Sequence, residues 1–362
     1  MTKQQKIASF DPSQPGLADA SIFGLPFTAD ESEIVIIPVP WEVTVSYGAG
    51  ASEGPEAILE ASFQVDLHHQ EFPELWKLGM FLDLNTETAQ WADDSSRFKA
   101  MAQPIIQALE SGEVIAENKS LKRDLETINS VCHELNEAVK ARTLYWLAKG
   151  KKVALLGGDH STPLGYYQAL ATVHSDFGIL HLDAHMDMRI AYEGFEYSHA
   201  SIMYNALQIP QISKIVQVGI RDFCEQEVEV VMAEENRVHV HTDNDLKAET
   251  YKGITWDEQC DAIIKALPQK VTVSFDIDGM YSWYCPNTGT PVPGGFSFEQ
   301  ATYLLNKLAD SGKEIIGFDL VEVAPGEDDW DGNVGARMLY HLCGVLAKNN
   351  GLEVGKRIHF NR

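Results

Sequence analysis

Two hydrophobic patterns alternate along the chain. Short apolar runs are typical of buried strands, which we expect at residues 33–38, 152–156, 178–182, 214–218, 238–241, 270–275 and 314–320. Stretches with apolar residues every three or four positions are typical of helices, which we expect near residues 54–62, 98–109, 120–148, 162–172, 224–235, 256–266, 297–311 and 334–348. Regular alternation of the two predicts a mostly parallel sheet with helices on both faces.

The same pattern divides the chain into a short arm and one large unit. Residues 1–32 carry Pro12, Pro15 and Pro26 among small and polar residues without a sustained period, which predicts an irregular N-terminal arm. No repeat or linker divides residues 33–362. We therefore expect a single three-layer α/β/α domain there, built around a mostly parallel sheet of about eight strands.

Composition agrees with a globular domain and narrows its partners. Of the 362 residues, 44% are hydrophobic, which is enough to fill a sizeable core. The formal net charge of −25 argues against a nucleic-acid partner, because phosphates attract lysine and arginine. The five cysteines form no CxxC pair, which favours reduced thiols and a cytoplasmic location. We expect no export signal and no membrane segment, since no apolar run reaches about 18 residues.

Candidate chemistry begins at the end of the strand expected at 178–182. Asp183, His185 and Asp187 follow it at every second position. An extended backbone points such residues to one face, so two carboxylates and an imidazole converge. Parallel α/β sheets place their sites at the carboxyl ends of strands, which makes this segment a candidate metal site.

Two further strand ends carry residues of the same kind. His160 lies in a Gly-Gly-Asp-His-Ser turn after the strand at 152–156, and Asp276 and Asp278 end the strand at 270–275. Taken singly, the first segment is equally well an incidental histidine in a tight turn. For the second segment, a solvated acidic loop is the less favoured alternative. Together with Asp183 and its neighbours they fit a two-metal centre with ions about 3.5–4 Å apart. Carboxylate-rich ligation without thiolate favours Mn²⁺, with Ni²⁺, Co²⁺ or Zn²⁺ as alternatives.

The three motifs resemble the signatures of the ureohydrolase family, which includes arginases, agmatinases, formimidoylglutamases and guanidine hydrolases. The likeness extends to residues 217–221, 288–295 and 319–325, and it covers about residues 33–348. It implies an arginase-like fold and a hydrolase with two Mn²⁺ per subunit. In this family, hydroxide bridging the two ions attacks the guanidinium or amidine carbon and releases urea or its analogue and an amine. Members form trimers or hexamers, which implies a homotrimer or homohexamer here.

The resemblance also assigns roles residue by residue. It implies that one ion is held by His160, Asp183, Asp187 and Asp276, and the other by Asp183, His185, Asp276 and Asp278. Asp183 and Asp276 are the implied bridging ligands, and Asp187 also belongs to the implied catalytic group.

Two more residues match catalytic positions of the family. Glu322 matches the glutamate that binds the substrate guanidinium, a role that suits a carboxylate able to form parallel hydrogen bonds. His199 matches the proton shuttle, although Ala200 replaces the usual glycine after it. We expect His181, upstream in the apolar run, to be a core histidine.

The substrate depends on residues around this centre. The sequence after Asp187 departs from that of arginases, which disfavours arginine as the substrate. Arg189 favours a carboxylate tail if it faces the pocket, whereas agmatine stays open if Arg189 meets an acidic neighbour. An aromatic loop borders either the pocket, where we expect Trp283 to contact substrate, or a subunit contact. The loop around Thr44 resembles that of guanidine hydrolases, and we expect Thr44 to contact substrate as well.

We therefore rank the hydrolysis of agmatine to putrescine and urea first. Guanidine hydrolysis to urea and ammonia comes second, followed by formimidoylglutamase or guanidinobutyrase activity. A different class, a deacetylase-like zinc hydrolase or a non-catalytic metal-binding member, also stays open. The six filled ligand positions argue against the deacetylase, and Glu322 argues against a loss of guanidinium chemistry.

Overall fold

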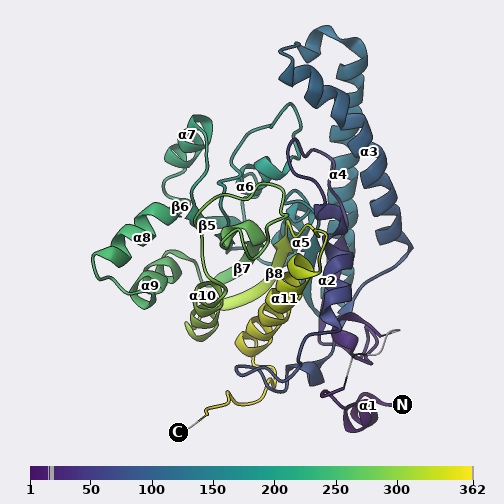
Figure 1. Ribbon diagram of the computed structural model, residues 1–362, viewed down its shortest axis with the longest axis vertical. Helices are drawn as coiled ribbons and strands as arrows, with labels where there is room; N and C mark the ends of the chain where they lie inside the picture. Colours follow the sequence, from purple (N-terminus) through teal and green to yellow (C-terminus); the bar gives the residue numbers. More distant parts are fainter. Residues whose placement is uncertain (15, 17–19, 361–362) are drawn as a thin grey trace.

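The computed structural model of the protein describes residues 1–14, 16 and 20–360. Its eight strands are β1 (Ile34–Val39), β2 (Met80–Leu82), β3 (Lys152–Gly157), β4 (Phe177–Leu182), β5 (Ile212–Ile220), β6 (Val238–Thr242), β7 (Lys270–Asp276) and β8 (Glu314–Val321). They form one sheet in the order β2-β1-β3-β8-β7-β4-β5-β6, and all neighbouring pairs are parallel. The expected three-layer α/β/α architecture is confirmed (Figure 1).

The helices of the described residues cover both faces of this sheet. They are α1 (Lys3–Ser9), α2 (Gly54–Ser62), α3 (Thr86–Glu110), α4 (Lys119–Ala148), α5 (Leu164–Val173), α6 (Ile202–Leu207), α7 (Glu225–Ala233), α8 (Asp243–Tyr251), α9 (Trp256–Ala266), α10 (Phe298–Asp310) and α11 (Trp330–Asn349). Helices α2, α9, α10 and α11 pack on one face, and α3 to α6 on the other.

Alternate strand residues build two separate cores. In β1, Ile34 and Ile36 contribute to one core, whereas Val35 and Ile37 contribute to the other, and all four are fully buried. Because helices cover both faces, each strand is apolar along its whole length instead of alternating with polar residues. This explains why the strands stand out in the sequence as continuous apolar runs.

The sheet order decides where the candidate site lies. Strands β3, β8, β7 and β4 occupy consecutive places in the middle of the sheet. Since they are parallel, their carboxyl ends meet at one edge of the sheet, although the last residues of β3 and β8, Gly157 and Val321, are 164 positions apart in the chain. The segments that follow these four strands are therefore neighbours in space.

Some elements differ from those expected. The apolar pattern missed β2, α1, α6 and α8, and it placed the starts of α3 and α11 too late. Strand β2 has three residues, and α1 and α6 have seven and six, which is too short for a period to show. Helix α8 buries only Asp243 and Leu246, so it has no apolar stripe. Helix α1 also means that the arm expected to be irregular contains regular structure.

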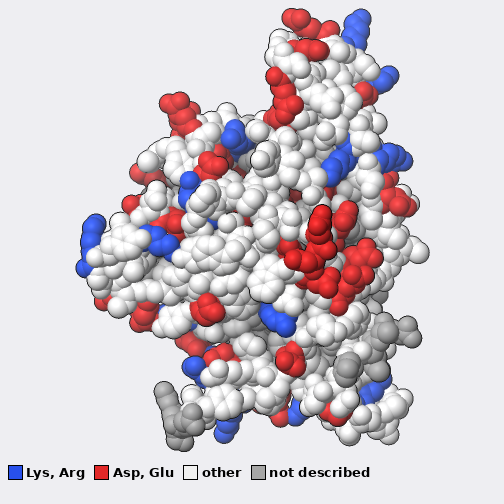
Figure 2. All heavy atoms as spheres, viewed as in Figure 1, with Lys and Arg blue, Asp and Glu red and all other residues white. Residues whose placement is uncertain are grey.

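Two surface features stand apart from the sheet and its cover. The paired helices α3 and α4 project beyond the rest of the molecule (Figure 1). Figure 2 shows acidic side chains gathered over the starts of α2 and α11, where Glu53, Glu56, Glu327, Asp328 and Asp329 are exposed. Among the described residues, no helix is both long and apolar enough to cross a membrane.

Candidate metal centre and active site

Acidic and histidine side chains from different segments meet at the carboxyl edge of the sheet. His160 follows β3, Asp183 to Asp187 follow β4, and Asp276 is the last residue of β7. Asp278 lies in the short 3-10 helix Ile277–Gly279 that continues β7. The six ligand candidates expected from the sequence are therefore brought together by β3, β7 and β4 in the middle of the sheet.

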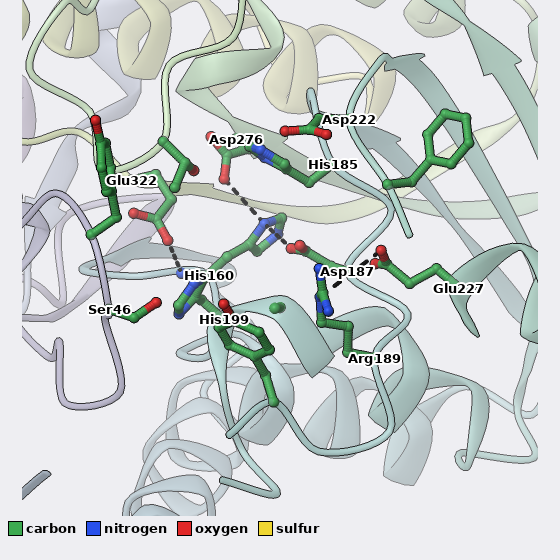
Figure 3. Close-up of a pocket in the computed structure, with 15 residues that line it drawn as sticks. Ser46, His160, His185, Asp187, Arg189, His199, Asp222, Glu227, Asp276 and Glu322 are labelled. Carbon is green, nitrogen blue, oxygen red and sulfur yellow. Dashed lines mark hydrogen bonds and ion pairs between the residues drawn. The ribbon is translucent and has the colours of Figure 1, made fainter. Parts of the chain in front are cut away.

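His160 is the centre of the first group of candidate ligands. Its Nδ1 lies 3.1 Å from Asp183 Oδ2, 3.1 Å from Asp187 Oδ2 and 3.2 Å from Asp276 Oδ2. Figure 3 shows Asp187 and Asp276 directed toward the His160 ring. This Nδ1 is buried and has no hydrogen-bond partner among the described residues. A buried imidazole nitrogen that faces three carboxylate oxygens without a hydrogen bond is suited to a cation.

A second group of candidate ligands forms around His185. Its Nδ1 lies 3.0 Å from Asp278 Oδ2 and 3.4 Å from Asp183 Oδ1. Asp183, His185 and Asp278 can offer ligand atoms to one ion. A second set of converging ligand atoms comes from His160, His181, Asp183 and Asp187. The two groups share Asp183, which contributes a different oxygen to each. This donor set fits two neighbouring divalent cations.

Backbone amides orient the carboxylates. His185 N–H donates to Asp183 Oδ1 over 2.6 Å, Ala184 N–H donates to Asp278 Oδ1 over 3.0 Å, and Asp278 N–H donates to Asp276 Oδ1 over 2.8 Å. Each carboxylate is thus held by a neighbouring turn. The local chain after β4 and β7 therefore sets the directions of these ligands before any ion binds.

The crowding and burial of these acids shift their pKa values. Burial, and then the charges of Asp278 and Asp183, raise the pKa of Asp276 well above its usual range. Burial and the charge of Asp183 raise the pKa of Asp187 to about 7. Divalent cations among the carboxylates would reverse both shifts, because they favour the ionised forms.

His181 lies next to the first group but is fully engaged in hydrogen bonds. Its Nε2 is 2.7 Å from Asp183 Oδ2, and the Gln217 side-chain amide is 3.0 Å from its Nδ1. Gln217 Nε2 also donates to the Met186 carbonyl over 2.7 Å. Since the amide nitrogen of Gln217 is a donor, Nδ1 accepts and Nε2 donates to Asp183. His181 is therefore a buried, hydrogen-bonded core histidine that supports Asp183.

Glu322 follows β8 and lines the same cavity as the ligands. Its Oε1 accepts a 2.8 Å hydrogen bond from the His160 backbone N–H. Burial, and then the charge of Asp159, raise its pKa well above the usual value, so a cationic partner would be strongly favoured. The φ angles of Glu322 and Asp187 are 63° and 54°, in the left-handed region. Such strain persists where the surrounding structure imposes it, and it is common in active sites.

His199 also lines this cavity. It begins the 3-10 helix His199–Ser201, and Ser198 Oγ lies 3.5 Å from its Nδ1. Burial, and then the neighbouring His185 and His160, lower its pKa to about 4. The lowered pKa favours the neutral ring and makes it a weaker base than a solvent-exposed imidazole.

The cavity has a volume of about 260 Å³. Beside the candidate ligands, it is lined by the basic residue Arg189 and by the acidic residues Asp222 and Glu227. Arg189 lines it, with its guanidinium carbon 4.7 Å from the centre of the Tyr192 ring and its Nε 4.0 Å from Glu227 Oε2 (Figure 3). Glu227 is itself held by the backbone N–H groups of Met188 and Cys224. Both situations considered for Arg189 thus occur together, because it faces the cavity and meets an acidic neighbour.

Two residues expected to contact substrate lie elsewhere. Trp283 is 62% exposed and stacks on Tyr281 at 4.3 Å between ring centres, outside the cavity lining. The loop turns outward because the Trp330 indole donates to the Trp283 carbonyl and holds it at the surface. Thr44 is 2% exposed and does not line the cavity either. Neither side chain therefore reaches the cavity within this chain, and contact of Trp283 and Thr44 with substrate stays a prediction.

The loop around Thr44 still reaches the site through Ser46 and Tyr47, which line the cavity. The buried Glu42 carboxylate accepts from Gly50 N–H over 2.9 Å, from Ser52 N–H over 3.1 Å and from Lys99 Nζ over 2.7 Å. Gly48 packs so closely that a Cβ there would lie 2.4 Å from the Gly289 carbonyl oxygen. This loop is thus fixed against the loop after β7.

Sequence reasoning missed several lining residues, including Ser46, Tyr192, Asp222, Glu227 and Thr290. Asp222 and Thr290 lie within or beside stretches that carried the family resemblance, which was an available signal. No sequence signal pointed to Glu227, because an acidic residue is common in the first turn of a helix such as α7.

Comparisons with known proteins agree with this geometry. Residues 32–344 match the model of the arginase family. An N(1)-aminopropylagmatine ureohydrolase of Thermus thermophilus is 30% identical over 326 residues, which cover 90% of this chain and 93% of the relative. An agmatinase of Neisseria meningitidis is 29% identical, with 82% and 81% covered. The crystal structure of the agmatine ureohydrolase of Thermoplasma volcanium superimposes with a TM-score of 0.68 at 21% identity, covering 96% of this chain and 99% of that one.

Proposed function

The chain belongs to the arginase family, and we propose that it is a ureohydrolase that converts agmatine to putrescine and urea. One observation carries the proposal. Glu322, the candidate guanidinium-binding residue, lies in one cavity with two ligand groups that share Asp183. A planar guanidinium held by this carboxylate would lie beside the candidate ligands. The names of the Thermus and Neisseria relatives support a guanidino amine as substrate.

We propose two Mn²⁺ per chain, with Ni²⁺ as the alternative. The support is chemical, because the donors are imidazole nitrogens and carboxylate oxygens without thiolate. The proposed holders are His160, Asp183, Asp187 and Asp276 for one ion, and Asp183, His185, Asp276 and Asp278 for the other. When bound, such a pair of cations acidifies water at neutral pH and so supplies the nucleophile.

The chain's own residues would perform the remaining steps. Glu322 binds and orients the guanidinium, which sets the carbon in line for attack. Water oxygen adds to that carbon, and the bond from the carbon to the alkyl nitrogen breaks. Asp187 holds the water by a hydrogen bond, and one water proton passes through neutral His199 to the leaving amine. The second water proton also passes to the amine as the carbon–oxygen bond of urea becomes double. Urea and the amine are then released.

Guanidine is a second candidate substrate, and Arg189 is the observation that favours it. A guanidinium side chain in the cavity repels an ammonium tail, whereas guanidine has no tail. The pairing of Arg189 with Glu227 weakens this repulsion, which keeps agmatine first. We further propose a cytoplasmic homotrimer or homohexamer, in line with the family resemblance and with five free cysteines.

A product panel tests the proposed function. Purified protein is loaded with Mn²⁺ or Ni²⁺, and urea release is measured from agmatine, guanidine, guanidinobutyrate and arginine, with formamide followed for formimidoylglutamate. We expect agmatine to show the highest kcat/KM. Two bound ions per chain without hydrolysis of any of these compounds would overturn the ureohydrolase assignment. One bound ion would point to the deacetylase-like alternative.

A further inference from the structure

A buried row of side chains leads from His160 away from the cavity and into the core. Ser274 Oγ lies 2.9 Å from His160 Nε2 and donates to Asp319 Oδ1 over 2.8 Å. The Tyr167 hydroxyl donates to Asp319 Oδ2 over 2.8 Å. Each of the four residues is at most 1% exposed. Asp319, Ser274 and Tyr167 do not line the cavity. The proposed reaction therefore assigns no role to the buried carboxylate of Asp319.

The sheet and helix α5 together hold Ser274, Asp319 and Tyr167 in place. Ser274 in β7 and Asp319 in β8 are direct partners in the parallel register. Tyr167 comes from α5, which packs on the adjoining face of the sheet. A charged carboxylate is costly to bury unless it is hydrogen-bonded, and these two hydroxyl groups meet that need. The same arrangement aims the serine oxygen at the His160 ring.

Counting protons gives every hydrogen bond in this row a direction. A serine hydroxyl has one proton, and Ser274 gives it to Asp319. The serine oxygen can then only accept from His160, so the imidazole carries a proton on Nε2. In the neutral ring this leaves a lone pair on Nδ1, the atom that faces Asp183, Asp187 and Asp276.

We propose that Asp319, acting through Ser274, is a positioning residue that holds His160 in the tautomer whose Nδ1 binds a cation. Tyr167 orients Asp319 from its other oxygen without influencing the serine proton. The inference rests on the proposed two-metal centre and adds residues outside its ligand set. Partners of this kind typically contribute 10- to 100-fold to metal affinity.

Four variants separate positioning from mere packing. Asp319→Asn keeps the shape but offers one acceptor oxygen to two hydroxyl donors. When its amide N–H faces Ser274, the serine turns its proton toward His160 Nε2. The imidazole proton would move to Nδ1 and point at the cation site. Ser274→Ala removes the relay itself. Ser274→Thr keeps the hydroxyl, and Tyr167→Phe removes only the outer hydrogen bond, so these two are matched controls.

The readout is Mn²⁺ affinity, obtained from the electron paramagnetic resonance signal of free Mn²⁺ during titration of the metal-free protein, with thermal unfolding followed in parallel. We expect two ions to bind to the wild type. In Asp319→Asn and Ser274→Ala, one of the two ions should bind about 10- to 100-fold more weakly. Ser274→Thr and Tyr167→Phe should stay close to the wild type at both sites.

Unchanged affinity for both ions in folded Asp319→Asn and Ser274→Ala would overturn the inference, even if their thermal stability falls, because it would show a purely structural role. If Asp319→Asn does not fold, Ser274→Ala decides alone, since it removes a single hydroxyl. If the wild type binds two ions and the variants bind both with the same affinity, only the inference about Asp319 is overturned. A wild-type protein that binds no Mn²⁺ overturns the proposed function as well.

Discussion

Asp183 is engaged through both of its oxygens. Oδ2 accepts from His181 over 2.7 Å and lies 3.1 Å from His160 Nδ1. Oδ1 accepts from the His185 N–H over 2.6 Å and lies 3.4 Å from His185 Nδ1. Each oxygen thus receives one hydrogen bond and keeps a lone pair beside one of the two histidines. This makes Asp183 the residue through which the two proposed ion sites are joined.

Replacing Asp183 with Asn should therefore remove both ions and the activity together. The amide nitrogen has no lone pair for a cation, and it carries no negative charge. Bound metal measured by elemental analysis should fall from two ions to none, with urea release lost in parallel. Asp176→Asn, an exposed change near the start of β4, is the matched control and should leave both unchanged. Full activity in Asp183→Asn would contradict the ligand assignment.

Arg189 is the residue to change in a test of tail recognition. Arg189→Met removes the positive charge and leaves Glu227 beside the cavity. The ratio of kcat/KM for agmatine to that for guanidine should rise by up to about fivefold, the size expected for a partly solvated charge pair. Tyr192→Phe keeps the ring under Arg189 and should not change the ratio. An unchanged ratio in Arg189→Met would show that Arg189 does not sense the tail.

At the scale of elements, the loop between β1 and α2 depends on Glu42. This carboxylate is fully buried and accepts from two backbone N–H groups and from Lys99. In Glu42→Gln, one carboxylate oxygen is replaced by a donor that faces other donors. We expect a loss of about 1–3 kcal/mol in the free energy of unfolding and a higher KM, because Ser46 and Tyr47 lose their support.

Chemical denaturation and steady-state kinetics measure these two effects. Glu53→Gln, an exposed change in the same segment, is the matched control and should match the wild type in both measurements. Equal KM values for Glu42→Gln and the wild type would mean that the loop does not shape the substrate site.

Helix α11 carries a pH-sensitive contact of its own. Its His341 is 3% exposed, and the ring centre lies 5.4 Å from that of His69. Burial, and then His69, lower the pKa of His341 to about 3, against an ordinary value of 6.5. The folded state thus holds the neutral ring. Its contribution to stability is fully present above pH 6.5 and is lost as the pH falls from 6.5 toward 3.

His341→Gln should flatten the fall in Tm over this range, because glutamine takes up no proton. Thermal unfolding at a series of pH values between 6.5 and 4 measures the slope. The exposed His133 on α4 is the control, and His133→Gln should keep the wild-type slope. A His341→Gln variant with the wild-type slope would place the acid sensitivity elsewhere.

For the whole molecule, assembly is the property to test. Large side chains at the cavity rim are exposed in the single chain, including Tyr47 at 85% and Phe223 at 45%. Exposed apolar groups beside a site favour a covering partner, whereas the net charge of −25 opposes association at low salt. We expect light scattering to give three or six copies near physiological salt, with dissociation favoured at low ionic strength. A monomer at every salt concentration would contradict this prediction.

Much of this architecture could be predicted because its causes are local. A strand covered on both faces must be apolar throughout, so the runs that became β1, β3, β4 and β7 were visible without coordinates. Asp183, His185 and Asp187 alternate by the geometry of an extended chain, and parallel strands bring their ends to one edge. Short or polar elements such as β2 and α8 were missed, because neighbours and not periodicity stabilise them.

By itself, then, the sequence determined the layers, the edge of the sheet that holds the site and the residues that gather there. Only the tertiary structure decided that Trp283 and Thr44 lie outside the cavity, that Arg189 pairs with Glu227, and that Asp319 reaches His160 through Ser274. The physical reason is the range of the interactions. Strand pattern and motif spacing act over a few residues, whereas these contacts join segments far apart in the chain, and their geometry depends on how the loops and strands pack.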